Sequence, residues 1–207
     1  MNGTYDQNDE VIRLSTRISN SIGHSHKSIL LTGVSEKDPV RAMAYELART
    51  LVCLGNGPVL LVEANFSPSF RGVKASSGSV GPGLLDVLRQ EITLSEAVFP
   101  DELPGLFHLP AGSTNCDYHV LLLSDQCGEL LKEMRQDYAF VIIESASILN
   151  HAECLHLSSR VDGVAVVVQP GVHQQSELAE LKHTIDGFQL PLLGVIFCSP
   201  PGKKLRK

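Results

Sequence analysis

The chain has 207 residues, 43% of them hydrophobic, with 17 lysines and arginines against 23 aspartates and glutamates. This length and hydrophobic content suit one domain with a sizeable core and exclude a disordered chain. Four of the cations lie in residues 203–207, so the first 202 residues carry 13 cations and 23 acidic side chains. Such an acidic body argues against nucleic acid as a partner and allows at most peripheral membrane contact through the basic end.

The predicted elements alternate strands with helices. Short, nearly continuous apolar runs predict strands that are covered on both faces, and apolar residues at helical spacing predict helices. In chain order we predict a helix over residues 10–22, a strand over 28–32, a helix over 38–54, a strand over 58–63, a long loop over 64–82, short helices over 83–90 and 94–98, a strand over 106–109, a helix over 119–137, a strand over 139–144, a helix over 152–160, a strand over 163–169, a helix over 174–188 and a strand over 192–197.

This alternation predicts an α/β fold with a doubly wound, mainly parallel sheet and helices on both faces. We expect an N-terminal helical segment over residues 1–27, the α/β domain over 28–198 and a flexible basic tail over 199–207. Ligands of such folds bind beyond the carboxyl ends of the strands. The segments that follow the first, second and fourth predicted strands are therefore the candidate functional regions.

The segment after the first strand is where a phosphate-binding loop would lie. Such a loop needs glycines that turn backbone N–H groups onto phosphate oxygens, a lysine for the phosphates and a Ser or Thr for Mg²⁺. In this chain the sequence is Thr32-Gly-Val-Ser-Glu-Lys-Asp-Pro-Val-Arg-Ala, in which Gly33 is the one glycine. Pro39 lacks an amide donor, and Asp38, as the expected N-cap of the next helix, would fill the anion site with its own carboxylate. A standard triphosphate cradle is not expected.

No cluster of metal-ligand residues has a convincing spacing. The five cysteines form no C-x-x-C pair. His151, Cys154 and His156 lie close together, but they lack the i, i+4 spacing that places two ligands on one helix face. We therefore expect no metal site.

Several strings keep a fixed order along the chain: Gly83-Leu-Leu-Asp-Val-Leu-Arg-Gln-Glu, Leu109-Pro-Ala-Gly, Tyr138-Ala-Phe-Val-Ile-Ile-Glu, Val161-Asp-Gly-Val and Leu193-Gly-Val-Ile. In order and spacing they resemble the cytoplasmic kinase domain of bacterial tyrosine autokinases, P-loop proteins of capsule and exopolysaccharide export that are related to the MinD and ParA ATPases. The resemblance covers most of the chain and implies a P-loop NTPase-like fold.

The chain departs from this family at the positions that would bind nucleotide. With Thr32 aligned to the start of the family's P-loop, Pro39 stands in place of the last glycine. Val40 then stands in place of the phosphate-binding lysine, and Arg41 in place of the Mg²⁺-binding Ser or Thr. The resemblance therefore implies a degenerate loop.

The acidic motifs of the family are altered as well. The family's D-x-D-x-R motif becomes Glu63-Ala-Asn65-Phe-Ser, which loses the second carboxylate and the arginine. The Walker B aspartate becomes Glu144, and one isolated carboxylate makes a poor Mg²⁺ site. The family's C-terminal tyrosine cluster is absent, since the last tyrosine of this chain is Tyr138.

A family helix that packs subunits into rings carries the pattern Glu-x-x-Arg-x-x-Arg. Here Glu10 and Arg13 match, but Thr16 takes the second arginine position and Arg17 follows one residue later, about 100° around the helix. A homo-oligomer interface and a solvated amphipathic helix both stay open.

Together these features predict a pseudokinase-like regulatory or scaffolding protein of exopolysaccharide or capsule biosynthesis, without catalytic residues or cofactor. Its expected partners are a membrane chain-length or export protein or a kinase paralogue, in the cytoplasm at the inner face of the plasma membrane. One alternative is an active Mg·ATP-dependent tyrosine kinase or ATPase, in which Lys37 and Arg41 supply the cations and Glu63 or Glu144 holds the metal. The other is a MinD/ParA-like interaction module.

Overall fold

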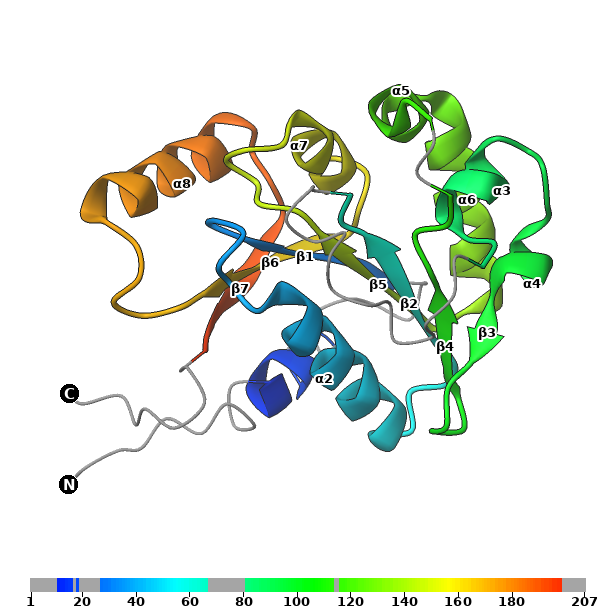
Figure 1. Cartoon of the computed structure of the whole chain (residues 1–207). Helices are drawn as coiled ribbons and strands as arrows, with labels where there is room; N and C mark the ends of the chain where they lie inside the picture. Colours follow the sequence, from blue (N-terminus) through cyan, green and yellow to red (C-terminus); the bar gives the residue numbers. More distant parts are fainter. Residues whose placement is uncertain (1–10, 17, 19–26, 67–80, 114–115, 199–207) are drawn as a thin grey trace.

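A seven-stranded sheet in the order β3-β4-β2-β5-β1-β6-β7 runs through the middle of the protein (Figure 1). The computed structural model describes residues 11–16, 18, 27–66, 81–113 and 116–198. The strands are β1 (Lys27–Gly33), β2 (Val59–Ala64), β3 (Phe99–Pro100), β4 (Leu106–Leu109), β5 (Phe140–Ser145), β6 (Gly163–Val168) and β7 (Leu192–Phe197). β3 pairs with β4 in the antiparallel sense, and the other neighbours are parallel.

Helices cover both faces of this sheet, which confirms the predicted fold class. They are α2 (Val40–Cys53), α3 (Leu84–Leu88), α4 (Leu94–Ala97), α5 (Tyr118–Leu123), α6 (Asp125–Asp137), α7 (Ala152–Ser158) and α8 (Gln175–Gly187). In Figure 1, α2 lies below the sheet, beside the short helical stretch of residues 11–16, whereas α5, α7 and α8 lie above the sheet and α6 is drawn at the right of the view.

The core is divided by the sheet into two clusters. Leu30 of β1 belongs to the cluster beneath α3, α6 and α7, whereas Ile29 and Leu31 belong to the cluster beneath α2. All six residues of β5 are buried, as expected for a central strand covered on both faces. This explains why the strand segments of the sequence are continuous apolar runs.

Three elements differ from the prediction. The single helix expected over residues 119–137 is broken at Ser124, whose extended backbone (φ −70°, ψ 160°) ends α5 and precedes α6. The two-residue strand β3 was not predicted. The helix after the first strand begins at Val40, with Pro39 rather than Asp38 as its N-cap residue.

Two of the sequence motifs that resemble the family, those beginning at Gly83 and at Leu109, contact each other. The Oδ2 atom of Asp86 accepts hydrogen bonds from the backbone N–H groups of Gly83 (2.8 Å) and Ser113 (3.2 Å), and Oδ1 forms an ion pair with Arg89. Gly112 packs so closely against Asp86 that a Cβ atom there would collide with the carboxylate. These strings therefore fix α3 to the loop after β4.

Parts of the predicted organisation lie outside the described residues. They include residues 10, 17 and 19–22 of the predicted first helix, residues 67–80 of the long loop and the basic tail over 199–207. Within the described ranges, the protein has no helix with the length and apolar character needed to span a bilayer.

Candidate functional site

The candidate site lies at the carboxyl ends of the central strands, as the doubly wound fold predicts. β1 ends at Gly33, and the strands on either side of it bring their last residues to the same edge of the sheet. Glu63 of β2 stands directly opposite Glu144 of β5 in the parallel register. The three candidate segments thus meet in one place.

Asp38 lies at the centre of the loop that follows β1. Its Oδ2 atom accepts hydrogen bonds from the backbone N–H groups of Val34 (2.9 Å) and Ser35 (3.0 Å). Its Oδ1 atom accepts a hydrogen bond from the N–H of Gln169 (2.9 Å) and lies 2.8 Å from Nε2 of His173. The carboxylate is fully buried. Four donors from two separate loops therefore converge on one internal anion.

This arrangement differs from the helix-capping role predicted for Asp38. The carboxylate turns back onto the loop itself, because the N-cap position is taken by Pro39. Gly33 permits this close packing, since a Cβ atom there would lie 2.9 Å from both the Cβ of Asp38 and the carbonyl oxygen of Ser35. The N–H groups that would face a bound phosphate in a phosphate loop are here hydrogen-bonded to a side chain of the same chain.

Three ionisable side chains form a second cluster beside the loop. Arg41, in the first turn of α2, makes an ion pair with Glu63 at the end of β2. Glu144 lies next to this pair with 1% of its surface exposed, and its Oε1 atom has no hydrogen-bond partner among the described residues. Burial raises the pKa of Glu144 to about 8, while Arg41 opposes and Glu63 adds to this effect. Glu144 is therefore largely protonated at neutral pH.

The cavity between these two clusters is small. Its volume is about 90 Å³, and it is lined by Asp38, Pro39, Arg41, Asn65 and Glu144 among others. Pockets that hold drug-sized ligands measure roughly 300–1,000 Å³, whereas one water occupies about 30 Å³ of liquid. The described residues thus leave room for a few waters between them.

The remaining loop positions point elsewhere. Val40 is buried and belongs to the core beneath α2. Lys37 is exposed, and its backbone N–H donates to Oγ of Ser35. The position aligned with the family's lysine is therefore apolar and buried, and the nearby cation faces solvent.

A chain of alternating carboxylates and imidazoles extends from the loop to α5. Glu36 lies 3.1 Å from Nε2 of His151, whose Nδ1 lies 3.3 Å from Glu153, and Glu153 lies 3.1 Å from Nδ1 of His119. The sequence analysis did not predict this row of carboxylates and imidazoles, and it did not predict the role of His173. The available signal for His173 was its place just after β6, at the ligand-binding edge of the sheet.

The structure tests neither the expected absence of a metal site nor the predicted oligomer helix. Within the described ranges, no group of three or more His, Cys, Asp or Glu residues is arranged to hold a metal ion. Cys154 faces the core, where Oγ of Ser145 lies 3.1 Å from the Cys154 sulfur, and burial raises the pKa of the Cys154 thiol to about 11.

In the helix whose family counterpart packs subunits into rings, Arg13 is exposed, while Glu10 and Arg17 lie outside the described residues.

Comparison of the sequence with characterised proteins identifies relatives of the predicted kind. The EpsB protein of Ralstonia nicotianae is 26% identical over 172 residues, which are 82% of this chain and 22% of that protein. The tyrosine-protein kinase YwqD of Bacillus subtilis is 27% identical over 188 residues, which are 90% of this chain and 77% of that protein. The chain is a homologue of bacterial tyrosine-protein kinases. It spans about a fifth of the length of EpsB.

The solved structures that resemble this homologue of the tyrosine kinases agree in fold. The kinase domain of VpsO superimposes with a TM-score of 0.83 at 22% identity, covering 94% of each chain. A ParA-family ATPase from Chlorobium tepidum has a TM-score of 0.69 at 14% identity, covering 89% of this chain and 77% of that chain. The P-loop fold shared with ParA and MinD proteins is thereby confirmed. No protein-family model matches the chain.

Proposed function

We propose that this chain is a catalytically degenerate relative of the bacterial tyrosine autokinases that acts as a regulatory or scaffolding protein in exopolysaccharide or capsule biosynthesis or export. One observation carries the proposal: the buried carboxylate of Asp38 takes the hydrogen bonds of the loop that would otherwise receive phosphate. The kinship with tyrosine kinases supplies the biological setting.

Electrostatic repulsion at the loop supports the proposal that the chain does not bind a triphosphate. Phosphoryl transfer depends on positioning and on neutralising the charge of the phosphates. A phosphate oxygen about 4 Å from the Asp38 carboxylate would meet a repulsion of about 4 kcal/mol at an effective dielectric constant of 20. The loop would have to expel this side chain, and with it four hydrogen bonds, before a triphosphate entered.

The residues also do not fit the Mg²⁺ ion that would accompany ATP. Arg41 holds the position of the family's Mg²⁺-binding Ser or Thr, and its guanidinium already neutralises Glu63. The neighbouring Glu144 has a pKa of about 8, so it offers a neutral carboxyl group rather than a carboxylate at neutral pH. A divalent cation prefers several charged or polar oxygens, and a resident guanidinium excludes it.

Partner binding is the activity left to such a protein. We propose as partners a membrane protein that controls polysaccharide chain length or export, or an active kinase paralogue, met at the cytoplasmic face of the membrane. The retained fold supports this role, because a degenerate site leaves the surfaces of the domain intact for protein contacts. A gene neighbourhood without glycosyltransferases or an export channel would instead favour a ParA-like interaction module.

The test is a titration of the full chain with Mg·ATP and Mg·ADP to millimolar concentration, followed by calorimetry and by thermal denaturation. YwqD of Bacillus subtilis serves as the positive control in the same buffers. We expect no saturable heat and no rise in melting temperature for this chain, because a ligand stabilises a protein only when it binds the folded state. Saturable binding would overturn the proposal and restore the active kinase or ATPase.

A further inference from the structure

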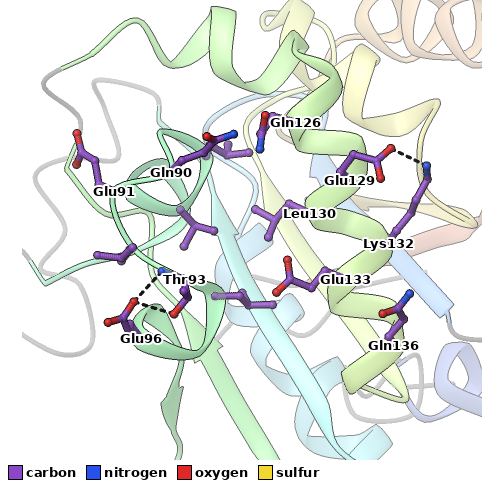
Figure 2. A pocket seen from close by; sticks show the side chains of 14 residues that line it. Gln90, Glu91, Thr93, Glu96, Gln126, Glu129, Leu130, Lys132, Glu133 and Gln136 are labelled. Atoms are coloured by element: carbon purple, nitrogen blue, oxygen red, sulfur yellow. Dashed lines mark hydrogen bonds and ion pairs between the residues drawn. The ribbon is translucent and has the colours of Figure 1, made fainter.

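A large groove lies away from the candidate site, between α6 on one side and α3 with α4 on the other (Figure 2). Its volume is about 690 Å³, within the range of roughly 300–1,000 Å³ that is typical of ligand sites. The buried side chains of Leu88, Leu94 and Leu130 contribute apolar surface to its lining. This groove is far larger than the cavity at the strand ends.

The charged residues of the groove are mainly acidic. Glu91, Glu96, Glu129 and Glu133 line it together with one cation, Lys132. Lys132 pairs with Glu129 at 2.7 Å, as the dashed line in Figure 2 shows, and Glu133 makes no hydrogen bond or ion pair with the described residues. The groove therefore combines apolar side chains with a clear excess of negative charge.

Two of these carboxylates have local partners that leave them at the surface. Glu91 lies 3.0 Å from Arg89, and Glu96 accepts hydrogen bonds from the backbone N–H and the hydroxyl of Thr93. Both glutamates are exposed. Contacts between exposed side chains of this kind contribute little to stability, so these carboxylates can interact with an incoming cation.

We propose that this groove binds the basic segment of residues 203–207 from a second copy of the chain. The segment reads Lys-Lys-Leu-Arg-Lys and holds four of the 17 cations of the chain. Its charges complement the glutamates of the groove, and Leu205, at its centre, complements the leucines. Both the charge pattern and the apolar centre of the segment thus match the lining.

The geometry favours a second copy over the same copy. The described chain ends at Cys198, just after the edge strand β7, whereas α6 packs on β5 and β1. On the other side of the groove, α3 packs on β2, and from β7 to β2 the sheet extends four strand spacings, about 19 Å. The five Cα–Cα steps from Cys198 to Lys203 span at most about 18 Å when fully extended. This connection is too short to seat the whole segment in its own groove.

Such a contact joins two different surfaces, so it is heterologous and leaves one groove and one segment free in each pair. It depends on exposed charges, which salt screens over about 8 Å at physiological ionic strength. The expected behaviour is a weak self-association that falls with rising salt. Self-association through this groove does not depend on whether the chain binds nucleotide.

The experiment measures self-association of the full chain by sedimentation velocity at 50 mM and 500 mM NaCl. A groove variant carries Glu129→Gln and Glu133→Gln, and a tail variant carries Lys203→Gln, Lys204→Gln, Arg206→Gln and Lys207→Gln. The matched control carries Glu180→Gln and Asp186→Asn, two exposed acids of α8. We expect each of the first two variants to weaken self-association at least tenfold, as high salt does for the native chain, while the control leaves it unchanged.

Mixing the groove variant with the tail variant tests whether the contact is made between copies. Each variant lacks one half of the contact, so together they retain one intact groove and one intact segment, and we expect a one-to-one pair. A labelled peptide of residues 203–207 should bind the tail variant and not the groove variant. A monomeric native chain, a mixture that forms no pair, or a peptide that binds both variants equally would overturn the proposal.

Discussion

Nε2 of His173 lies 2.8 Å from Oδ1 of Asp38, and both side chains are buried, although the two residues stand 135 positions apart in the chain. This contact ties the loop after β1 to the segment between β6 and α8. The same carboxylate also accepts hydrogen bonds from two N–H groups of its own loop. The Asp38 side chain therefore bridges two segments at the carboxyl edge of the sheet.

We expect Asp38→Ala to lower the free energy of unfolding by about 3–5 kcal/mol, because removing one partner of a buried charged network leaves its donors unpaired. Chemical denaturation in a phosphate-free buffer measures this loss. Inorganic phosphate at millimolar concentration should recover part of it, since the freed N–H groups can donate hydrogen bonds to another anion.

The matched control is Asp186→Ala, an exposed aspartate of α8. Its free energy of unfolding should change by less than about 0.5 kcal/mol, as is usual for surface positions. Equal stabilisation of both variants by phosphate would show a general salt effect and contradict the specific explanation.

Glu144→Gln should remove a pH dependence of stability. The pKa of Glu144 is raised from 4.5 to about 8, so between these values the folded protein keeps a proton that the unfolded chain has lost. The free energy of unfolding of the native chain therefore falls as pH rises through this window, by up to about 1.4 kcal/mol per pH unit from this group. Glutamine does not ionise, so the variant should gain stability relative to the native chain from pH 5 to pH 8.

Denaturation curves at half-unit pH intervals measure this difference, with Glu180→Gln on the exposed face of α8 as the control. The control should run parallel to the native chain, because the side chain of Glu180 is exposed to water in the folded as in the unfolded state. Parallel curves for Glu144→Gln would show that its pKa is not raised.

The sequence predicts the sheet well because its strands are buried on both faces, which leaves a continuous apolar signal, as in Phe140–Ser145. It does not reveal β3, because Phe99 and Pro100 pair with β4 through tertiary contact and carry no strand pattern of their own. The break at Ser124 had a local signal, since Ser followed by Asp is typical of a helix start.

At the candidate site, the sequence indicates where charges replace glycine and lysine but not how they are arranged. The hydrogen bonds of Asp38 come partly from Gln169 and His173, and no local pattern links these residues to the first loop. The capping role predicted for Asp38 followed from adjacent residues alone. Its actual role depends on the β1–β6 pairing that brings the two loops together.

Gly112→Ala should destabilise the protein by about 2–4 kcal/mol. The residue has φ of +80°, which is unfavourable for alanine, and a Cβ atom there would also collide with the Asp86 carboxylate. Gly171 is a close control, because its φ is +77° and a Cβ atom there would meet nothing within 4 Å. Gly171→Ala should lower the free energy of unfolding by only about 1 kcal/mol, because it introduces the unfavourable backbone conformation without a collision. If thermal denaturation shows the same loss of stability for Gly112→Ala and Gly171→Ala, the close contact with Asp86 does not contribute to the effect.

Restoring the family's loop should restore nucleotide binding if the substitutions are what prevents it. We expect the combined variant Asp38→Ala, Pro39→Gly, Val40→Lys and Arg41→Ser to bind Mg·ATP, because it removes the internal carboxylate and returns the amide, the lysine and the hydroxyl. Removing Arg41 also frees the Glu63 carboxylate, its ion-pair partner, for a metal.

Thermal denaturation measures this gain. Nucleotide at ten times its dissociation constant stabilises the folded state by about 1.4 kcal/mol, which for a domain of this size raises the melting temperature by roughly 3–6 °C. The same variant with Val40 retained is the control, and its shift should be much smaller because it lacks the lysine that contacts the phosphates. A combined variant that is folded by circular dichroism yet shows no shift with Mg·ATP would mean that features beyond this loop abolish nucleotide binding.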